Sequence, residues 1–458
     1  MATHPSIDGY PNHGSEKYLT DILRDELGFK GNVLSEGSNT GTLIYERVVA
    51  TEKEAGPIVL NAGVDVNITF ESGYMEDMIE NINEGNVRME LLDRAVRRVL
   101  SLKFRLGLFE DPFVDVERAI DIVHNEEHQD LALEAAREGI VLLKNEEGLL
   151  PLDKDIRSIA VIGPNANDRE NLLGDYIPKK LLYDAVTVLE AIKGKVSQQT
   201  RVSYVKGCNV LDSTLNEIPA ARTAASQADI AIVVVGEDER TNGESDDAAD
   251  LDLTGYQADL IKAVHGTGTP TIVILISGRP LTIRWTAENA SAILEAWMCG
   301  ERGGEAIADV LFGDYNPGGK LPVTIPRHVG QLPVYYNFKP SKTYWLEKGW
   351  GNSYADIDYK PLYEFGFGLS YSEFEYNNLK IGPDATGRYG NFKISLDVKN
   401  VSKRAGAEIV QLYIRDRIST VVRPVKELKG FYKIMLQPGE TNTVNFELGY
   451  DELKCLTE

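Results

Sequence analysis

Hydrophobic and polar positions alternate between helical and strand-like spacing over the first 113 residues of the chain. Helices are predicted at residues 15–27, 44–55, 74–83 and 89–104, and short strands at residues 33–34 and 63–68. The spacing in the fourth helix places Leu92, Val96, Val99 and Leu100 on its inner face. Strands that alternate with helices are typical of a parallel sheet. Because a (β/α)8 barrel takes about 250 residues, residues 1–113 are predicted to be only the C-terminal part of one.

A second series of strands and helices runs through residues 158–334. Strands are predicted at residues 159–162, 202–205, 230–235, 271–276 and 292–297, with helices at 185–193, 216–227, 255–265 and 304–311. Strongly apolar strands separated by helices predict a doubly wound α/β sandwich domain. Residues 114–157, which come before it, are predicted to be a connecting helix and linker with Leu131 and Ile140 on one face.

Helical spacing is lost in the C-terminal part of the chain. Residues 335–373 form a predicted linker loop rich in tyrosine and tryptophan. In residues 374–458, strand-like segments lie at residues 392–398, 408–414, 430–436 and 441–448. Short strands divided by glycine and proline turns predict a β-sandwich of the immunoglobulin or fibronectin type III kind.

Composition limits the partners that the chain can have. It carries 70 acidic and 48 basic residues, a formal net charge of −22, which argues against nucleic acid or an anionic membrane surface as a partner. No apolar run approaches the roughly 18 residues of a membrane span. Cys208, Cys299 and Cys455 are too few and too far apart for a disulfide framework or a metal cluster, so free thiols are predicted.

Two acidic residues are candidates for chemistry. Glu36 directly follows the short strand at residues 33–34 and is followed by Gly37. Barrels of the α/β kind place catalytic carboxylates at the C-terminal ends of strands, although Glu36 could instead cap the helix that follows. Glu244 is one of eight carboxylates in residues 237–252. The composition of this segment alone favours a solvated acidic loop.

Nine segments of the chain match one protein family in one order. They are residues 8–11, 19–31, 33–36, 61–66, 94–109, 136–145, 235–237, 304–326 and 363–371. With this ordered set the chain resembles the C-terminal portion of a glycoside hydrolase family 3 β-glucosidase. The resemblance implies a partial (β/α)8 barrel, an α/β sandwich and a fibronectin type III-like domain, in the positions predicted above.

The resemblance also implies an activity and the residues that perform it. The expected enzyme is a retaining, exo-acting β-glycosidase that hydrolyses terminal non-reducing β-D-glucosyl or xylosyl residues of an oligosaccharide or β-glycoside. Glu36 matches the family nucleophile and Glu244 the general acid/base, with Met1, His4 and Ser35 in substrate-binding positions. Neither a metal nor an organic cofactor is expected. In a retaining enzyme the two carboxyl groups stand about 5–5.5 Å apart.

Some features depart from the family pattern. The family nucleophile is usually an aspartate followed by a bulky aromatic residue, whereas the chain has Glu36 and Gly37. Asp65, the other acid at a strand end, matches a structural position. Met1 matches the sixth barrel strand, so the first five strands are expected to be missing, and the final sandwich strand is expected to be missing as well.

These departures leave other interpretations open. One is a non-catalytic or incomplete fragment that needs a complementing barrel chain or forms a homo-oligomer. Another is a family hydrolase for a different sugar, such as N-acetylglucosamine or arabinose. The sequence leaves the sugar, the linkage and the oligomeric state open, and does not distinguish a cytoplasmic, periplasmic or secreted location.

Overall fold

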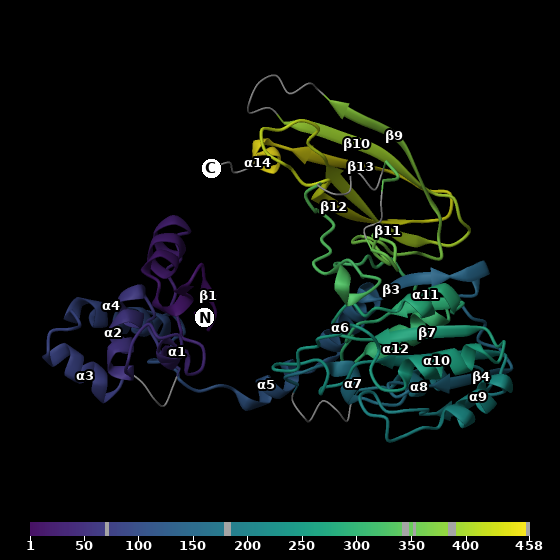
Figure 1. Ribbon diagram of the computed structural model, residues 1–458, viewed down its shortest axis with the longest axis horizontal. Coiled ribbons are helices and arrows are strands. Elements are labelled where there is room, and N and C mark those ends of the chain that lie inside the picture. The colour runs from purple at the N-terminus through teal and green to yellow at the C-terminus, as the bar shows by residue number, and fades with distance from the viewer. Residues whose placement is uncertain (69–72, 178–184, 341–347, 351–353, 383–390, 455–458) are drawn as a thin grey trace. The chain divides into compact units, whose positions relative to one another are not determined.

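A computed structural model describes residues 1–68, 73–177, 185–340, 348–350, 354–382 and 391–454. The chain divides into two compact units, Met1–Val123 and His124–Glu458 (Figure 1), here called unit 1 and unit 2. None of the described helices combines the length and the apolar character needed to cross a bilayer. Cys208 and Cys299 are free thiols, as predicted, and Cys455 lies outside the described residues.

Unit 1 contains three short stretches of chain that run parallel to one another. Ala2 pairs with Ser35, and Leu34 pairs with Val66, so the second stretch lies between the first and the third. The Ala2 N–H donates to the Leu34 carbonyl at 2.7 Å, and the Ser35 N–H donates to the Val66 carbonyl at 2.8 Å. The strands predicted at residues 33–34 and 63–68 therefore exist only as single bridges.

Helices and a small hairpin make up the rest of unit 1. They are β1 (Ser6–Ile7), β2 (Tyr10–Pro11), η1 (Asn12–Gly14), the π-helix η2 (Lys17–Glu26), α1 (Asn39–Tyr45), α2 (Glu52–Ala62), α3 (Glu76–Asn83), α4 (Met89–Arg105) and α5 (Val116–Ile122). The prediction of one helix over residues 44–55 is wrong. Arg47 has a φ of +61° just after α1, and the Thr51 side chain caps a new helix by accepting the Glu54 N–H.

The predicted inner face of α4 is only partly correct, since Leu92 and Val99 are half-buried but Leu100 is exposed. Leu91 and Ala95 are the buried hydrophobic residues of this helix, whereas Val96 is 47% exposed. Arg98, one turn after Ala95, extends inward and donates to Asp65 Oδ1 at 2.8 Å. Because a charged residue occupies the inner face, hydrophobic spacing alone gives an orientation that is only partly correct.

Unit 2 contains a six-stranded sheet in the order β3-β8-β7-β6-β4-β5. Its strands are β3 (Val141–Asn145), β4 (Ser158–Ile162), β5 (Arg201–Val205), β6 (Ile230–Gly236), β7 (Thr271–Ile276) and β8 (Ala292–Glu295). Strands β4 to β8 are parallel, which confirms the five predicted strands, and β3 is antiparallel to β8. The chain order reverses between β4 and β6, the switch point of a doubly wound sheet.

Alternate residues of each central strand point into two separate cores. In β6, Ile232 joins one core and Val233 the other, and both are fully buried. Helices cover both faces of the sheet (Figure 1): α8 (Val188–Lys195) and α12 (Gly303–Leu311) on the first core, α9 (Ile218–Ser226) and α10 (Gln257–His265) on the second. A parallel strand buried on both faces has a continuous apolar sequence, which is why these strands were predictable.

The segment predicted as a connecting helix and linker contributes a strand to this sheet. Helix α6 (Glu126–Gly139) ends before Ile140, and β3 follows at once and pairs with β8. The predicted helix face is therefore wrong: Leu131 is 63% exposed, and Ile140 is fully buried beyond the helix.

The C-terminal part of unit 2 is a β-sandwich, as predicted. Its strands are β9 (Phe374–Gly382), β10 (Phe392–Asn400), β11 (Gly406–Ile414), β12 (Glu427–Leu436) and β13 (Thr441–Leu448), in sheets β13-β10-β9 and β11-β12. Val398, Val410 and Leu436 lie at the centre of its buried core. The predicted linker loop at residues 335–373 falls partly outside the described residues.

Asn316 connects the α/β domain to the sandwich. Its side-chain oxygen accepts the Tyr371 N–H at 2.9 Å and the Ser370 hydroxyl at 3.0 Å. Its side-chain NH2 donates to Ser372 Oγ at 2.8 Å and to the Ala405 carbonyl at 2.9 Å. All four hydrogen-bonding positions of the amide are therefore used.

Candidate active site

Glu36 directly follows the middle parallel stretch of unit 1. Its N–H donates to the Ala2 carbonyl at 2.9 Å, and its Oε2 accepts the backbone N–H of His4 at 3.2 Å. The His4 ring Nε2 lies 4.0 Å from the same oxygen, and the Glu36 side chain is 33% exposed. The N-cap residue of α1 is Ser38, so Glu36 does not cap this helix. The carboxylate is oriented by the first stretch and remains accessible, as a nucleophile requires.

Met1 and Ser35, the other predicted substrate-binding residues of unit 1, are placed differently. Met1 is 73% exposed, whereas Ser35 is fully buried. The Ser35 hydroxyl donates to Asn67 Oδ1 at 2.8 Å and accepts the Ile68 N–H at 2.7 Å. These bonds hold the second and third stretches together, and a role of Ser35 in substrate binding stays a prediction.

Asp65 has a structural environment. Its side chain is fully buried and pairs with Arg24 Nη2 and Arg98 Nη1, each at 2.8 Å. Its Oδ2 also accepts the Val33 N–H at 3.0 Å. A carboxylate that is enclosed by two guanidinium groups and bonded to the backbone has no free side to attack a substrate.

Glu244 lies in unit 2, on the loop that follows β6. The loop begins with a turn in which the Thr241 N–H donates to the Asp238 carbonyl at 3.0 Å. Ser245 has a φ of +70°, and the Glu244 N–H donates to Asp175 Oδ2 at 3.0 Å. The Glu244 side chain is exposed. The loop thus fixes the backbone at Glu244 and leaves the carboxyl group open.

The point where this loop leaves the sheet requires a glycine. Gly236, the last residue of β6, has a φ of +141°, and a Cβ there would lie 1.9 Å from the Ile276 carbonyl oxygen of β7. Only glycine combines this conformation with so close an approach. Next to it, the buried Asn165 at the end of β4 donates to the Glu237 carbonyl at 3.0 Å. The start of the Glu244 loop is therefore fastened to both neighbouring strands.

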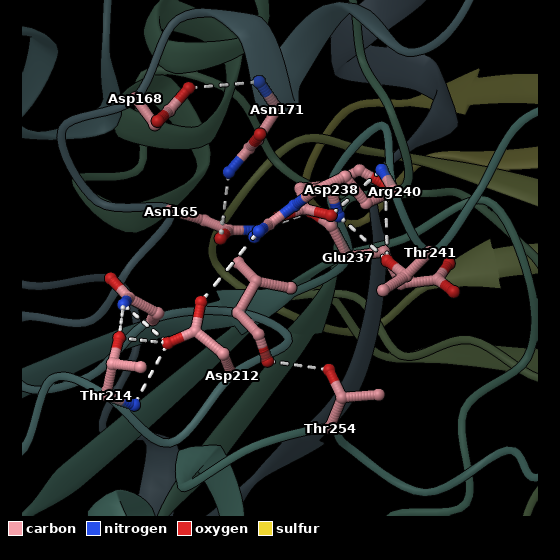
Figure 2. Close-up of polar contacts among 12 residues, drawn as sticks. Asn165, Asp168, Asn171, Asp212, Thr214, Glu237, Asp238, Arg240, Thr241 and Thr254 are labelled. Atoms are coloured by element: carbon pink, nitrogen blue, oxygen red, sulfur yellow. Dashed lines mark hydrogen bonds and ion pairs between the residues drawn. The ribbon is translucent and has the colours of Figure 1, made fainter.

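A polar cavity of about 190 Å³ lies at the carboxyl ends of β4, β5 and β6. Its lining includes Asp168, Asn171, Asp238 and Arg240. In Figure 2, Asn171 bonds to Asp168 and to Asn165, and Arg240 and Asp238 face each other. Sequence reasoning missed these residues. The available signal was their position directly after strands at the switch point, where doubly wound sheets bind ligands.

Two buried acids lie at the carboxyl ends of β6 and β8, the strands on either side of β7. Burial raises the pKa of Glu237, which follows β6, above its ordinary value. Burial also raises the pKa of Glu295, at the end of β8, to about 8. The Oε1 atom of Glu295 accepts the Trp297 N–H at 3.1 Å and the Ser277 hydroxyl at 3.2 Å.

The predicted site residues fall into two groups. Glu36 and His4 lie side by side in unit 1, and Glu244 belongs to unit 2. In the described part of the chain, no three His, Cys, Asp or Glu side chains are grouped so as to hold a metal ion.

Family comparisons cover nearly the whole chain. Residues 140–371 match the family model described as the glycosyl hydrolase family 3 C-terminal domain, and residues 1–102 match the N-terminal domain of the same family. Residues 408–458 match a fibronectin type III-like domain.

Individual relatives match the chain from end to end or nearly so. A beta-xylosidase of Formosa agariphila is 41% identical over 100% of this chain and 64% of its own length. A periplasmic beta-glucosidase of Salmonella typhimurium is 38% identical over 99% of this chain and 63% of its own length. The crystal structure of a beta-glucosidase from Listeria innocua in complex with glucose has a TM-score of 0.89 and 34% identity, covering 98% of this chain and 61% of that one. The chain therefore spans somewhat under two thirds of the length of these relatives.

Proposed function

The chain belongs to glycosyl hydrolase family 3, and on that premise we propose that it carries both catalytic carboxylates of a retaining, exo-acting β-glycosidase. Its substrates are β-glycosides or oligosaccharides with terminal non-reducing β-D-glucosyl or xylosyl residues. One observation carries the proposal: each matched domain presents an accessible carboxylate, Glu36 after a parallel stretch and Glu244 on a loop beyond a parallel sheet. The names of the relatives, beta-xylosidase and beta-glucosidase, support the substrate class.

The proposed reaction is a double displacement. The Glu36 carboxylate attacks the anomeric carbon while Glu244 donates a proton to the departing glycosidic oxygen, which leaves a glycosyl ester on Glu36. Glu244, now ionised, takes a proton from a water molecule, and that water cleaves the ester with overall retention of configuration. Two carboxyl groups about 5–5.5 Å apart are required. His4, whose backbone N–H bonds to Glu36, holds the nucleophile in place.

The domain assignment follows the same reasoning. We propose that residues 1–113 form the C-terminal part of a (β/α)8 barrel, joined by residues 114–157 to an α/β sandwich domain at 158–334. A linker at 335–373 then leads to the fibronectin type III-like domain at 374–458. The parallel pairing of Ala2 with Ser35 and of Leu34 with Val66 supports the barrel assignment, because successive barrel strands are parallel neighbours.

The glutamate at position 36 changes the geometry that the family usually has. Glutamate carries its carboxyl group one methylene further from the backbone than aspartate does. A Cβ built on Gly37 would meet no heavy atom within 4 Å, so there is free space beside the candidate nucleophile. We propose that this space accommodates the longer side chain and changes the fit to the sugar.

Turnover of 4-nitrophenyl glycosides tests the proposal. We expect hydrolysis of the β-D-glucoside or the β-D-xyloside, with the β-anomer as the first product in a proton NMR time course. Initial formation of the α-anomer would contradict a retaining mechanism. The panel also includes the N-acetyl-β-D-glucosaminide and the α-L-arabinofuranoside. Cleavage of one of these two, without cleavage of the glucoside or the xyloside, would identify another sugar as the substrate.

A second candidate is an incomplete fragment that needs a complementing barrel chain. The observation that favours it is the pairing in unit 1: among the described residues, Ala2 and Val66 each form a parallel bridge on one side only. An unpaired edge of a parallel sheet is a template for a further strand. Turnover that rises when the chain is mixed with a fragment carrying the first five barrel strands would support this candidate, and equal turnover without the fragment would contradict it.

A further inference from the structure

The loop that carries Glu244 is closed at its base by one side chain, Arg279. The Nη2 atom of Arg279 donates to the Thr241 carbonyl at 2.6 Å and to the Asp246 carbonyl at 3.1 Å. Thr241 comes before Glu244 in the sequence and Asp246 comes after it. The same nitrogen lies 3.4 Å from Asn242 Oδ1. One guanidinium group therefore ties the two ends of the segment that presents the candidate acid.

Arg279 is itself held by a buried partner. Its Nε lies 2.9 Å from Glu237 Oε1, and the two side chains are 18% and 7% exposed. The second carboxylate oxygen of Glu237 accepts the Gly278 N–H at 3.0 Å. Glu237 directly follows β6 and Arg279 follows β7, and these strands are neighbours in the sheet. The arginine is therefore anchored to a buried carboxylate at the ends of two central strands.

The residues beneath the loop pack closely against Asn242. A Cβ built on Gly278 would lie 2.1 Å from Asn242 Nδ2, so a side chain there would require Asn242 to move. The Nδ2 atom of Asn242 also donates to Met298 Sδ at 3.0 Å. The contacts around Glu244 thus involve the backbone and Asn242, and they leave the Glu244 carboxyl group open.

We infer that Arg279 is a positioning residue for Glu244, with Glu237 as its anchor; this inference rests on the proposed function. A general acid must reach the glycosidic oxygen with an accuracy of about 0.5 Å, and a misplacement of 1 Å can cost about a hundredfold in rate. Arginine suits the task because its planar fork has several donors in fixed directions, so it can bind Glu237 and two carbonyls together. Lysine keeps the charge but concentrates it on one nitrogen.

Kinetics on two kinds of leaving group test the inference. Departure of an alkoxide needs protonation by the acid, whereas departure of 2,4-dinitrophenolate does not. For Arg279→Lys we expect kcat/KM on an alkyl β-glycoside to fall about 10- to 100-fold, with a change of only a few fold on the 2,4-dinitrophenyl glycoside. Glu244→Gln should show the same selectivity more strongly.

Arg137→Lys is the matched control, because Arg137 also pairs with a buried carboxylate, that of Asp309, with its Nε 2.7 Å from Oδ2. It lies on α6, and in the described part of the chain its side-chain hydrogen bonds go to Asp309 and not to the Glu244 loop. For the control we expect kcat/KM on each of the two substrates to stay within about twofold of the value for the unchanged protein. An equal loss on both substrates for Arg279→Lys would overturn the inference.

Amide hydrogen exchange on the intact chain gives a readout that does not depend on turnover. Arg279→Lys should speed exchange in residues 239–247 at least tenfold and leave β6 and β7 protected, and Arg137→Lys should change neither. Unchanged exchange in the loop would overturn the inference whatever the activity. If Glu244→Gln leaves the leaving-group selectivity unaltered, the proposed function fails. Faster exchange in Arg279→Lys would then show that Arg279 holds the loop but does not position a general acid.

Discussion

The two units hold their candidate carboxylates in different ways. In unit 2 the Glu244 loop grows out of a six-stranded sheet whose central strands are fully buried on both faces. In unit 1, Glu36 follows a stretch held by single bridges to Ala2 and Val66 and by a buried cluster around Asp65. This difference shows that the Glu244 half of the proposed site has a complete scaffold of its own, the six-stranded sheet. The other half depends on single bridges, the ion pairs of Asp65 and a smaller hydrophobic cluster that includes Val33 and Leu43.

The largest effect is expected from removing the candidate nucleophile. Glu36→Gln leaves the side-chain volume almost unchanged but removes the negative charge, so kcat on aryl glycosides should fall by roughly 10³-fold or more. Glu80→Gln, which affects an exposed carboxylate paired with Lys53 in the same unit, is the control and should retain activity. Full activity in Glu36→Gln would end the role proposed for this residue.

The next effect concerns the stability of unit 1. Asp65→Asn leaves Arg24, whose side chain is 7% exposed, without its buried counter-charge. Breaking a buried ion pair on one side costs about 3–5 kcal/mol, so the urea transition of unit 1 should move to much lower denaturant concentration. Circular dichroism and tryptophan fluorescence measure this, because no tryptophan lies in unit 1 and fluorescence reports on unit 2 alone. A fluorescence transition that moves as far as the dichroism transition would contradict separate scaffolds.

Core substitutions sharpen the same comparison. Ile232→Ala in β6 and Leu43→Ala in α1 each truncate a fully buried side chain, and each should cost about 2–5 kcal/mol. The first should lower the unfolding midpoint of unit 2 and the second that of unit 1. If either substitution lowers both midpoints equally, the units unfold as one cooperative body.

The smallest effect is a pH dependence confined to unit 2. Glu295 keeps its proton in the folded chain until about pH 8, whereas in the unfolded chain it loses the proton near its ordinary value of 4.5. Folding therefore takes up a proton between these values, and this contribution to stability declines as pH rises, by at most about 1.4 kcal/mol per pH unit.

Glu295→Gln removes the titrating group but keeps an oxygen to accept the Trp297 N–H. The unfolding free energy of unit 2 should then fall less steeply between pH 5 and pH 8 than in the unchanged protein, as followed by urea titration at several pH values. An equal slope in both proteins would show that the acid is ionised in the folded state.

The sequence predicted the regular parts of the fold well. The central strands of unit 2 are continuous apolar runs, such as residues 230–235, and these were located within one or two residues. The prediction failed where polar contacts decide the structure. Arg98 reaches inward from α4 to Asp65, so the inner face predicted for that helix was only partly correct. Strand β3 follows α6 almost at once, after Gly139 and Ile140, and was included in the connecting segment.

The candidate site could be predicted only in part. Glu36 and Glu244 were selected as candidates because ordered family motifs match their positions, and composition alone favoured a solvated loop for Glu244. The hydrogen bond between Arg279 and Thr241 joins residues 38 positions apart, and a local sequence pattern does not predict such a contact. The polar residues at the switch point, such as Asp238, belong to separate loops that only the sheet order brings together.

Asn316 gives the joint between the α/β domain and the β-sandwich chemical durability. Asparagine side chains age by deamidation, in which the backbone nitrogen of the next residue attacks the amide and closes a five-membered ring. The next residue here is Pro317, which has no N–H to supply that nucleophile. The amide that takes part in this joint is thus placed where spontaneous conversion to aspartate is blocked, and it should outlast an equivalent asparagine followed by glycine.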